Sequence, residues 1–552
     1  MKQKVVIVGG VAGGAGTAAR LRRLDETAEI VLFERGDYIS FANCGLPYYI
    51  GDVIRERENL LVMKAELMAG RFRVDVRVKS EVIAINRTRK TVTVRGGTGE
   101  IYEESYDKLV LSTGSAPVIP EIPGIADPNV FTLWNMGDVD RIKAFVTREK
   151  PRRAVVVGAG FIGLEMAENL REIGLEVSLV AKYNQVMPKV DYELGQILNK
   201  TLRSHGVSLC LEEKLTECRR EESGLQAVLT SGNCLNTDMI VLAIGVRPNS
   251  KLAEEAGLAL NARKGVVVDE HLKTSDDNIY ALGDVVEVRH FVSGKPVMIP
   301  LAGPANKQGR ICGDNLAGIP STYPGSLGSS VAKVFDMTVA TTGLVEKQLK
   351  EMGMQPSKDY FVAKTHAFSH ATYYPDAKQM ALKVLYLPDG TIVGAEAVGA
   401  EGVDKRMDVI ATAIHFKGTV YDLKELDLCY APPYSSAKDP VNMIGFMAEN
   451  NLSGRCQYIT WDEYKAMDKS DVILLDVRET EEVALGVIEN AVHIPLNSLR
   501  ENLDQLDRTK KIVVCCAIGL RAYVACRILI QNGFHAIDLS GGYTTYSQWM
   551  LP

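Results

Sequence analysis

The stretch Gly158-Ala159-Gly160-Phe161-Ile162-Gly163 follows a short β-branched run, Ala154 to Val157, and opens a helical pattern. A strand, a GxGxxG turn and a helix in this order are typical of a βαβ unit that binds a dinucleotide. The second strand of the unit, Glu176 to Val180, should end in an acidic residue if the ligand is NAD. Ala181 and Lys182 stand there instead. Because Lys182 could accept a 2′-phosphate, the sequence leaves NADH and NADPH open.

A second unit of the same kind stands near the first residues of the chain. Lys4 to Val8 is predicted as a buried parallel strand, and a glycine-rich turn and a helical pattern follow. Gly14 and the exposed amides would admit a pyrophosphate at the helix N-terminus, and Glu34 is placed to accept ribose hydroxyls. Val11 replaces the middle glycine of the motif, so this copy is less specific. Two such units in one chain favour dinucleotide binding over a tight turn without a ligand.

Segments far apart in the sequence complete the two units. Leu109 to Gly114 closes the first unit, Met239 to Gly245 has the pattern of the exit strand of the second, and Asn278 to Asp284 follows the second. Asp284 could bond a ribityl hydroxyl. We therefore predict an α/β fold with two interleaved Rossmann-like dinucleotide-binding domains.

A single cysteine, Cys44, stands in the stretch from Ser40 to Gly51, just after the first unit. A cysteine at such a strand-to-helix junction can have its thiolate stabilised by helix N-terminal amides, which lowers its pKa. The alternative is a buried small hydrophobe, as most free cysteines are. Cys44 has no nearby partner in the sequence, so its oxidised form would be a mixed disulfide, a persulfide or a sulfenic acid.

A new α/β pattern follows a polar stretch, Asn450 to Gln457, that we predict as a linker. Two strands are predicted at Val472 to Leu475 and at Lys511 to Val514, and Cys516 to Arg521 opens a helix. The loop amides after Cys516 can form an anion cradle, Arg521 adds positive charge, and a persulfide on Cys516 would be anionic and held there. Cys515 is expected to point into the core.

The composition is that of an ordinary globular protein, with 552 residues, 46% hydrophobic and 24% charged. A formal net charge of -6 argues against a nucleic-acid surface. The ten cysteines are too dilute for a disulfide scaffold and contain no CxxC pair for zinc, which favours reduced thiols in the cytoplasm. No apolar run reaches the roughly 18 residues of a transmembrane helix. His366 and His370 lie in a pattern that is not helical, so we expect no metal site.

Residues 1 to about 450 resemble the two-dinucleotide-domain flavoprotein disulfide reductases, and among these look most like coenzyme A-disulfide reductases and related NAD(P)H oxidases and polysulfide reductases. The matching stretches are Ser40 to Gly51, Thr274 to Asp284, Pro300 to Asn306, and two tyrosine motifs at His370 to Pro375 and Cys429 to Tyr434. The last hundred residues resemble a rhodanese sulfurtransferase domain. Their landmarks are Asp476 to Glu479, Ala491 to Pro495, Cys516 to Arg521, and Gly541-Gly542-Tyr543.

The resemblance implies a catalytic arrangement. Two-cysteine members of the family place a second cysteine five residues after the first, where this chain has Tyr49. The external thiol on Cys44 would then be coenzyme A. The family's third domain forms a homodimer, and its tyrosines, matched here by Tyr373 and Tyr430, reach the partner's cysteine. From the residues alone, these tyrosines could instead be core aromatics beside proline turns.

The resemblance also implies domain boundaries and ligand contacts. The domains would be an FAD-binding domain at 1-113 and 250-323, an NAD(P)H-binding domain at 114-249, a dimerisation domain at 324-449, the linker at 450-457, and a rhodanese domain at 458-552. The FAD contacts would be Gly9, Gly10, Ala12, Gly13, Gly14, Glu34, Arg35, Asn43, Val82, Ser112, Thr113, Gly114, Gly283, Asp284 and Ala302. The NAD(P)H contacts would be Gly158, Gly160, Phe161, Ile162, Gly163, Glu165, Lys182 and Gly245. The coenzyme A contacts would be Gly16, Arg20, Arg23, Ser40, Asn43, Cys44, Asn306 and Lys438.

The expected protein is a cytoplasmic, FAD-dependent and NAD(P)H-driven reductase of coenzyme A persulfide, polysulfide or coenzyme A disulfide. Cys44 would carry the reduction, assisted by Tyr373 and Tyr430, and Cys516 with Arg521 would transfer sulfur. The six-residue loop from Cys516 to Arg521 goes with sulfur transfer in the rhodanese family, although an inactive rhodanese fold is the alternative. Two other functions stay open: an NADH oxidase or peroxidase that cycles Cys44 through sulfenic acid, and a slow redox-sensing or sulfur-carrying module. Neither nucleic acid nor a membrane is expected as a partner.

Overall fold

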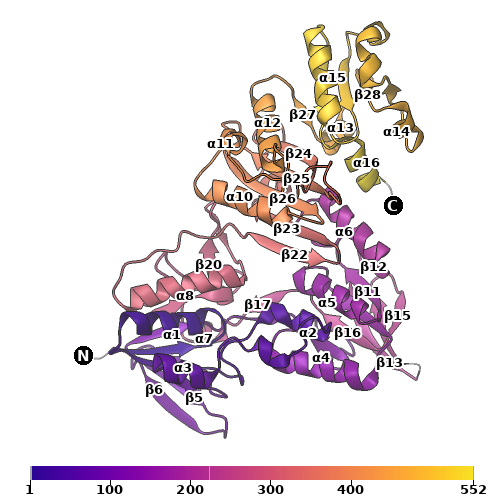
Figure 1. The fold of residues 1–552 in the computed structure, drawn as a ribbon. Coiled ribbons are helices and arrows are strands. Elements are labelled where there is room, and N and C mark those ends of the chain that lie inside the picture. Colours follow the sequence, from indigo (N-terminus) through magenta and orange to yellow (C-terminus); the bar gives the residue numbers. More distant parts are fainter. Residues whose placement is uncertain (1–2, 223, 551–552) are drawn as a thin grey trace. The chain divides into compact units, whose positions relative to one another are not determined.

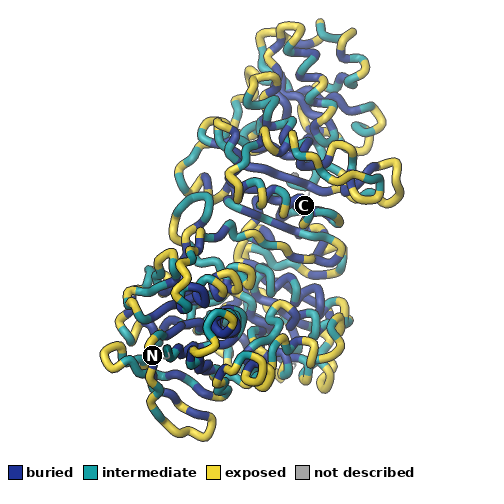
Figure 2. Tube along the Cα trace, turned by 60° about the vertical axis from the view of Figure 1, so that its left-hand side comes forward, coloured by how far each residue is buried: buried dark blue, intermediate teal, exposed yellow. Residues whose placement is uncertain are grey.

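The computed structural model describes residues 3–222 and 224–550. The chain divides into two compact units. The first comprises Met1–Asn184 and Gly206–Gly328, and the second comprises Gln185–His205 and Ser329–Pro552 (Figure 1). In both, the buried residues concentrate on the sheets and on the inner faces of the helices, as Figure 2 shows. No helix among the described residues is long and apolar enough to cross a membrane.

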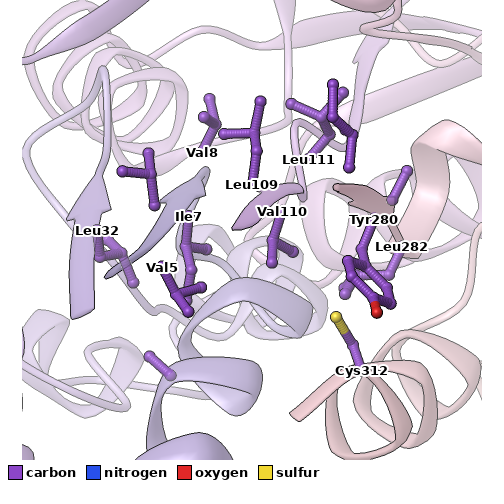
Figure 3. Packing of buried hydrophobic residues seen from close by; sticks show 14 of the residues in the cluster. Val5, Ile7, Val8, Leu32, Leu109, Val110, Leu111, Tyr280, Leu282 and Cys312 are labelled. Carbon is purple, nitrogen blue, oxygen red and sulfur yellow. The ribbon is translucent and has the colours of Figure 1, made fainter. Parts of the chain in front are cut away.

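The first sheet of the first unit is parallel, with the strand order β19-β7-β1-β2-β3. Figure 3 shows aliphatic side chains of β1, β2 and β7 in this core, with Tyr280 and Cys312 next to each other at one side of the cluster. Ile279 of β19 lies opposite Leu109 of β7, although the second nucleotide-binding unit separates them in sequence. This pairing confirms the predicted interleaving. The strands are β1 (Lys4–Val8), β2 (Glu29–Phe33), β3 (Asp75–Arg77), β7 (Lys108–Leu111) and β19 (Ile279–Ala281).

The second sheet of this unit is also parallel, with the order β12-β11-β10-β16-β9. It contains β10, the strand before the full GxGxxG turn. It also contains β11 and β16, which correspond to the strands predicted at Glu176 to Val180 and Met239 to Gly245. A parallel sheet buried on both faces explains the nearly continuous apolar runs in the sequence. The strands are β9 (Val130–Thr132), β10 (Arg153–Val157), β11 (Glu176–Ala181), β12 (Val207–Leu211) and β16 (Met239–Leu242).

Helices and small sheets surround the two parallel sheets. Helix α1 (Gly13–Leu24) packs against α8 (Ala302–Leu316), where the Thr17 hydroxyl donates to the Gly309 carbonyl over 3.2 Å. The other helices are α2 (Leu46–Ile50), α3 (Ala65–Phe72), α4 (Met136–Glu149), α5 (Phe161–Glu172) and α7 (Lys251–Glu255). The small sheets are β4-β5-β6 (Glu81–Asn86, Thr91–Arg95, Ile101–Ser105), β13-β14-β15 (Leu215–Glu221, Gly224–Leu229, Cys234–Thr237), β8-β17 (Ser115–Pro117, Val246–Pro248) and β18-β20-β21 (Val266–Val267, Val286–Arg289, Pro296–Val297).

An antiparallel sheet forms the first part of the second unit, with the order β22-β23-β26-β25-β24. Its strands are β22 (Ser330–Val334), β23 (Met337–Gly343), β24 (Phe361–Phe368), β25 (Gln379–Tyr386) and β26 (Ile392–Gly399). Its helices are α9 (Glu346–Glu351), α10 (Val403–His415), α11 (Val420–Glu425) and α12 (Pro440–Leu452). His366 lies on β24, and its Nε2 lies 2.8 Å from the Thr545 hydroxyl.

The segment Gln185–His205 belongs to this second unit, although the prediction assigned it to the NAD(P)H-binding domain. It carries helix α6 (Tyr192–Ser204). The Lys383 ammonium explains the difference, because it lies 2.6 Å from Asp191, 3.0 Å from Glu193 and 2.7 Å from Glu346. With its side chain only 1% exposed, Lys383 fixes the start of α6 against the antiparallel sheet.

The last part of the second unit is a parallel sheet with the order β27-β31-β30-β28-β29. Its strands are β27 (Tyr458–Ile459), β28 (Val472–Asp476), β29 (Val492–His493), β30 (Lys511–Cys515) and β31 (His535–Leu539). Its helices are α13 (Trp461–Ala466), α14 (Thr480–Ala484), α15 (Leu520–Gln531) and α16 (Gly542–Met550). The linker prediction was wrong for Asn450 to Leu452, which continue α12 because Ala448 and its neighbours bury an apolar helix face.

Candidate functional sites

The first glycine turn is built for close backbone approach. Gly9 has a φ of 92°, and a Cβ on it would lie 2.2 Å from the Ser112 carbonyl oxygen, so only glycine fits. The Glu34 carboxylate closes the turn, since it accepts from the Gly10 amide over 3.0 Å and from the Gly36 amide over 2.8 Å. Ala12 precedes α1 with a φ of 54°. Glu34, the acidic residue predicted to bind the ribose, therefore lies directly beside the first glycine turn.

The ends of β7 and β19 bring a second group of candidate residues to this turn. Asp284 accepts from the Ser115 hydroxyl over 2.9 Å, and burial raises its pKa. Thr113 donates to the Asn249 carbonyl over 2.8 Å, and the Gly283 amide donates to the Gln308 side chain over 2.7 Å. Ser115, Asn249 and Gln308 were missed, since none of them lies in a recognisable motif. Ser112 and Val82 are buried, and Arg35, Asn43, Gly114 and Ala302 are at least partly exposed.

The second glycine turn repeats the geometry of the first. Gly158 has a φ of 109°, and a Cβ on it would lie 2.2 Å from the Ala243 carbonyl oxygen. No atom would lie within 4 Å of a Cβ on Gly160 or Gly245, so open space faces these residues. Helix α5 begins at Phe161, and Ile162 is half-buried. Lys182 is exposed after β11, with its Nζ 5.4 Å from the centre of the Tyr183 ring.

Cys44 lies in a short 3₁₀ turn, Asn43–Gly45, directly before α2. The prediction of a lowered pKa was wrong for this structure: partial burial of the thiol and the charges of Glu165 and Asp284 raise the pKa of Cys44. Helix α2 has only five residues, so its N-terminal dipole is too weak to offset these effects. The residue as a whole is exposed, which excludes the buried-hydrophobe alternative.

Tyr48 and Glu165 stand beside Cys44. The Tyr48 phenol donates to the Glu165 carboxylate over 3.5 Å, and the charge of Cys44 acts on Tyr48. Burial raises the pKa of Glu165 to about 7, and the neighbouring Glu168 adds to the shift. A carboxyl group with this pKa can exchange a proton near neutral pH. Tyr48 was not predicted as a site residue, although it lies in the Cys44 stretch.

The predicted coenzyme A contacts are divided between the two units. Gly16 faces open space, because no atom would lie within 4 Å of a Cβ on it. Arg20 is ion-paired with Asp314 over 2.6 Å, whereas Arg23 stacks on Phe72. The Asn43 side chain donates to the Trp134 carbonyl over 3.3 Å. Ser40 is half-buried and Asn306 is exposed in the first unit, and Lys438 is exposed in the second.

The two predicted tyrosines lie together in the second unit. The phenol oxygens of Tyr373 and Tyr430 are 2.5 Å apart, and the side chains are 74% and 46% exposed. The alternative of core aromatics is therefore wrong. The hydrogen bond between Tyr373 and Tyr430 raises the pKa of Tyr373, which keeps its proton at neutral pH.

Cys516 lies at the end of β30, where the loop amides turn toward it. The Gly519 amide donates to its Sγ over 3.1 Å, and the amides of Ile518 and Ala522 also act on the thiolate. Burial and the charge of Asp538 nevertheless raise the pKa of Cys516. Cys515 is fully buried on the other face of the sheet, as predicted.

Arg521 forms an ion pair with Glu482, in addition to placing positive charge near Cys516. Its guanidinium donates to the Glu482 carboxylate of α14, with an Nη2–Oε1 distance of 2.7 Å. Arg478, buried and 2.7 Å from Asp476, stacks on Tyr543 at 3.9 Å, and the Tyr543 amide donates to the Cys516 carbonyl over 2.7 Å. The sequence pointed to Arg521 and to the Asp476–Arg478 motif but not to Glu482, which belongs to no motif.

Comparison with known families matches three segments of the chain. The family described as pyridine nucleotide-disulphide oxidoreductase matches residues 3–309, its dimerisation domain matches residues 329–440, and a rhodanese-like domain matches residues 460–548. These matches confirm the predicted fold class.

Individual relatives agree with the families. The coenzyme A disulfide reductase of Staphylococcus epidermidis is 37% identical over 450 residues, which cover 81% of this chain and 100% of the relative. The crystal structure of reduced CoADR-RHD from Bacillus anthracis is 49% identical, with a TM-score of 0.97 and coverage of 100% of this chain and 98% of that one. The structure of an NAD-dependent persulfide reductase from A. fulgidus is 38% identical, with a TM-score of 0.91 and coverage of 98% and 100%.

Proposed function

Because the chain belongs to the pyridine nucleotide-disulphide oxidoreductase family and carries a rhodanese-like domain, we propose that it is a NAD(P)H-driven flavoprotein reductase of sulfane sulfur and coenzyme A disulfide. The observation that carries this function is the lone Cys44, exposed beside Glu165 and Asp284, with Tyr49 in place of a second cysteine. A reductase of this design needs an external thiol to complete its disulfide.

The first glycine turn and Asp284 fit FAD. The turn admits a pyrophosphate between Gly10 and Gly14, the Glu34 carboxylate can accept the adenosine ribose hydroxyls, and Asp284 can bond the ribityl chain. When bound, FAD supplies a ring that accepts hydride from the nicotinamide and passes the electrons to sulfur. The second turn would hold the NAD(P)H pyrophosphate at Gly160, and Lys182, which follows Ala181 where an acidic residue would select NAD, leaves room for either NADH or NADPH.

Coenzyme A is the external thiol that the chain's chemistry suits. In the first unit, Arg20 and Arg23 offer positive charge to its phosphates, and Gly16, Ser40, Asn43 and Asn306 offer small or amide side chains. Lys438, in the second unit, stays a contact predicted from the family resemblance. The names of the coenzyme A disulfide reductase and persulfide reductase relatives support the same class of substrate. Arg20 would have to share its guanidinium with Asp314.

The reaction at Cys44 is a thiol–disulfide exchange. The Cys44 thiolate attacks the inner sulfur of coenzyme A persulfide, the S–S bond breaks, and hydrosulfide leaves with the electron pair. A Cys44–coenzyme A mixed disulfide remains, and its return to two thiolates takes up two electrons. Tyr373, held protonated by Tyr430, would supply the proton to the departing sulfur. Following the family resemblance, a second subunit brings these tyrosines, so we propose a homodimer.

The rhodanese-like part would feed this reaction. Cys516 would accept sulfane sulfur, and the amides of Ile518, Gly519 and Ala522 would hold the resulting anion. Cys516 would then pass the sulfur to coenzyme A. A sulfur-transfer domain has no part in reducing a simple disulfide, so the fusion favours persulfide or polysulfide as the substrate.

One observation also supports an alternative function, that of an NADH oxidase or peroxidase. Cys44 is alone and exposed, which also suits a cysteine that cycles through sulfenic acid in an NADH oxidase or peroxidase. Mass spectrometry of the isolated protein separates the two functions. We expect coenzyme A bound through a reducible disulfide to the peptide that contains Cys44. A Cys44 peptide that carries only oxygen adducts after growth and purification would favour the oxidase.

A further inference from the structure

Tyr373 and Tyr430 come from two different loops of the second unit, and one buried arginine bonds to both loops. The loop from β24 to β25 carries Tyr373, and the loop from α11 to α12 carries Tyr430. The phenols are exposed, whereas Arg406 of α10 is only 1% exposed. Because a charged group is buried only where its donors find partners, the hydrogen bonds of Arg406 identify the segments that it holds.

The guanidinium of Arg406 joins the bases of the two loops. Its Nη2 donates to the Ser369 carbonyl of the first loop over 2.9 Å and to the Ser435 hydroxyl of the second loop over 3.1 Å. The Ala371 amide of the first loop also donates to the Ser435 carbonyl over 3.0 Å. Ser369, Ala371 and Ser435 are buried, so water does not compete for these bonds. The two loops are therefore held together at their buried bases, while the tyrosines that they carry are exposed.

A buried carboxylate holds the guanidinium in place. Asp439 accepts from the Arg406 Nη2 over 2.9 Å and from the Ser435 hydroxyl over 2.6 Å. It also caps α12, since it accepts from the Val441 amide over 3.0 Å. The Arg406 Nη1 donates to the Gly402 carbonyl at the start of α10 over 3.2 Å. A planar guanidinium can bond these groups in several fixed directions at once, which a single ammonium cannot.

We propose that Arg406 positions the proton-donating pair by holding the two loops so that the phenols of Tyr373 and Tyr430 stay in contact. A phenol–phenol distance of 2.5 Å requires both loops to be fixed, and exposed loops are mobile unless buried contacts fix them. Arg406 acts on the loop bases rather than on the phenols, so it is a positioning residue. The catalytic consequence of the contact rests on the proposed function, whereas the contact itself does not.

The first test measures the contact between the tyrosines and is made in the full-length Cys44→Ser chain, so that it does not depend on reductase activity. Illumination with tris(bipyridyl)ruthenium and persulfate couples neighbouring tyrosines as dityrosine. Trypsin then releases the two tyrosines in peptides 365–378 and 425–438. We expect these peptides joined through Tyr373 and Tyr430, with fragment spectra assigning the linked residues.

Two variants and one control complete this test. Arg406→Lys keeps the charge beside Asp439 but replaces the fork with one nitrogen, so the yield of joined peptide should fall about fivefold. Ser435→Ala removes the hydroxyl between these two side chains, leaves their ion pair, and decides the test if Arg406→Lys does not fold. Ser436→Ala, at the next position, is the matched control and should keep the yield of the parent chain.

All chains are illuminated well below their midpoints of thermal unfolding, which circular dichroism measures, so that unfolding does not account for a loss. An undiminished yield in the deciding variant, or no joined peptide in the parent chain, would overturn the proposal.

The second test separates positioning from a general structural role. In the otherwise wild-type chain, the deciding variant should lower kcat for persulfide reduction about tenfold and leave the KM for the nicotinamide cofactor unchanged. In a chain that already carries Tyr373→Phe and Tyr430→Phe, it should lower kcat by less than about twofold, because the pair that it positions is gone. Equal losses in both chains would contradict positioning. A lost cross-link with unchanged kcat would leave the positioning of the tyrosines in place and overturn their proposed proton donation.

Discussion

The phenol oxygens of Tyr373 and Tyr430 lie 2.5 Å apart, on two exposed loops of the antiparallel domain. If this pair supplies the proton to the departing sulfur, Tyr373→Phe and Tyr430→Phe together should lower kcat for persulfide reduction by roughly 10²-fold. The KM for the nicotinamide cofactor, NADH or NADPH, should not change. Steady-state kinetics under anaerobic conditions measure both quantities.

Tyr434 provides the control for this pair, since it is 72% exposed in the same loop as Tyr430. Tyr434→Phe should leave kcat within about twofold of wild type, as expected for a surface substitution without a partner. A double tyrosine variant that keeps full kcat would remove the pair from the mechanism.

Glu165 should control the acidity of Cys44. Its negative charge disfavours a thiolate, so Glu165→Gln should lower the pKa of Cys44 and increase its alkylation rate about threefold to tenfold. Because the pKa of Glu165 is about 7, the carboxylate is charged above that pH. The effect should therefore be present above about pH 7 and fade below it. Iodoacetamide kinetics across pH check this, with the exposed Glu172 of α5, changed to glutamine, as the control.

Glu482 should weaken the effect of the Arg521 charge on the pKa of Cys516. Glu482→Gln removes the carboxylate that pairs with the guanidinium, so more positive charge acts on Cys516 and its pKa should fall. We expect sulfur transfer from thiosulfate to cyanide to become roughly twofold to fivefold faster at neutral pH. Glu481→Gln, at an exposed position next to Glu482, should have no effect. Slower transfer in Glu482→Gln would mean that the ion pair orients the loop instead.

Lys383 should be essential for the stability of the second unit. Lys383→Met leaves the carboxylates of Asp191, Glu193 and Glu346 without their shared cation, which should cost about 3–5 kcal/mol in the free energy of unfolding. Lys350→Met, at a half-exposed pair with Glu346, should cost about 1 kcal/mol or less. Urea unfolding followed by circular dichroism compares the two variants. Similar losses in both would contradict the assigned role of Lys383.

Periodicity and glycine spacing predicted the elements that the sheets contain. Strands β1, β10 and β30, and the helices that open at Gly13, Phe161 and Leu520, lie where the pattern placed them, because a buried parallel strand and a glycine turn leave a local signature. The interleaving was also predictable, since the exit segment at Asn278 carries its own motif.

Properties that depend on tertiary contacts were not predictable. The acidity of Cys44 follows from Glu165 and Asp284, which come from segments far away in the sequence. The placement of α6 depends on Lys383, which lies on β25, and nothing near Asp191 indicates this partner.

The most direct test of the central claim measures hydrosulfide release from coenzyme A persulfide and polysulfide, driven by NADH or NADPH under anaerobic conditions. Wild type, Cys44→Ser and Cys516→Ser are compared in parallel. We predict that Cys44→Ser abolishes NAD(P)H-driven release, whereas Cys516→Ser reduces only the release from polysulfide. Full activity of Cys44→Ser, or turnover by wild type with oxygen alone, would contradict the proposed function.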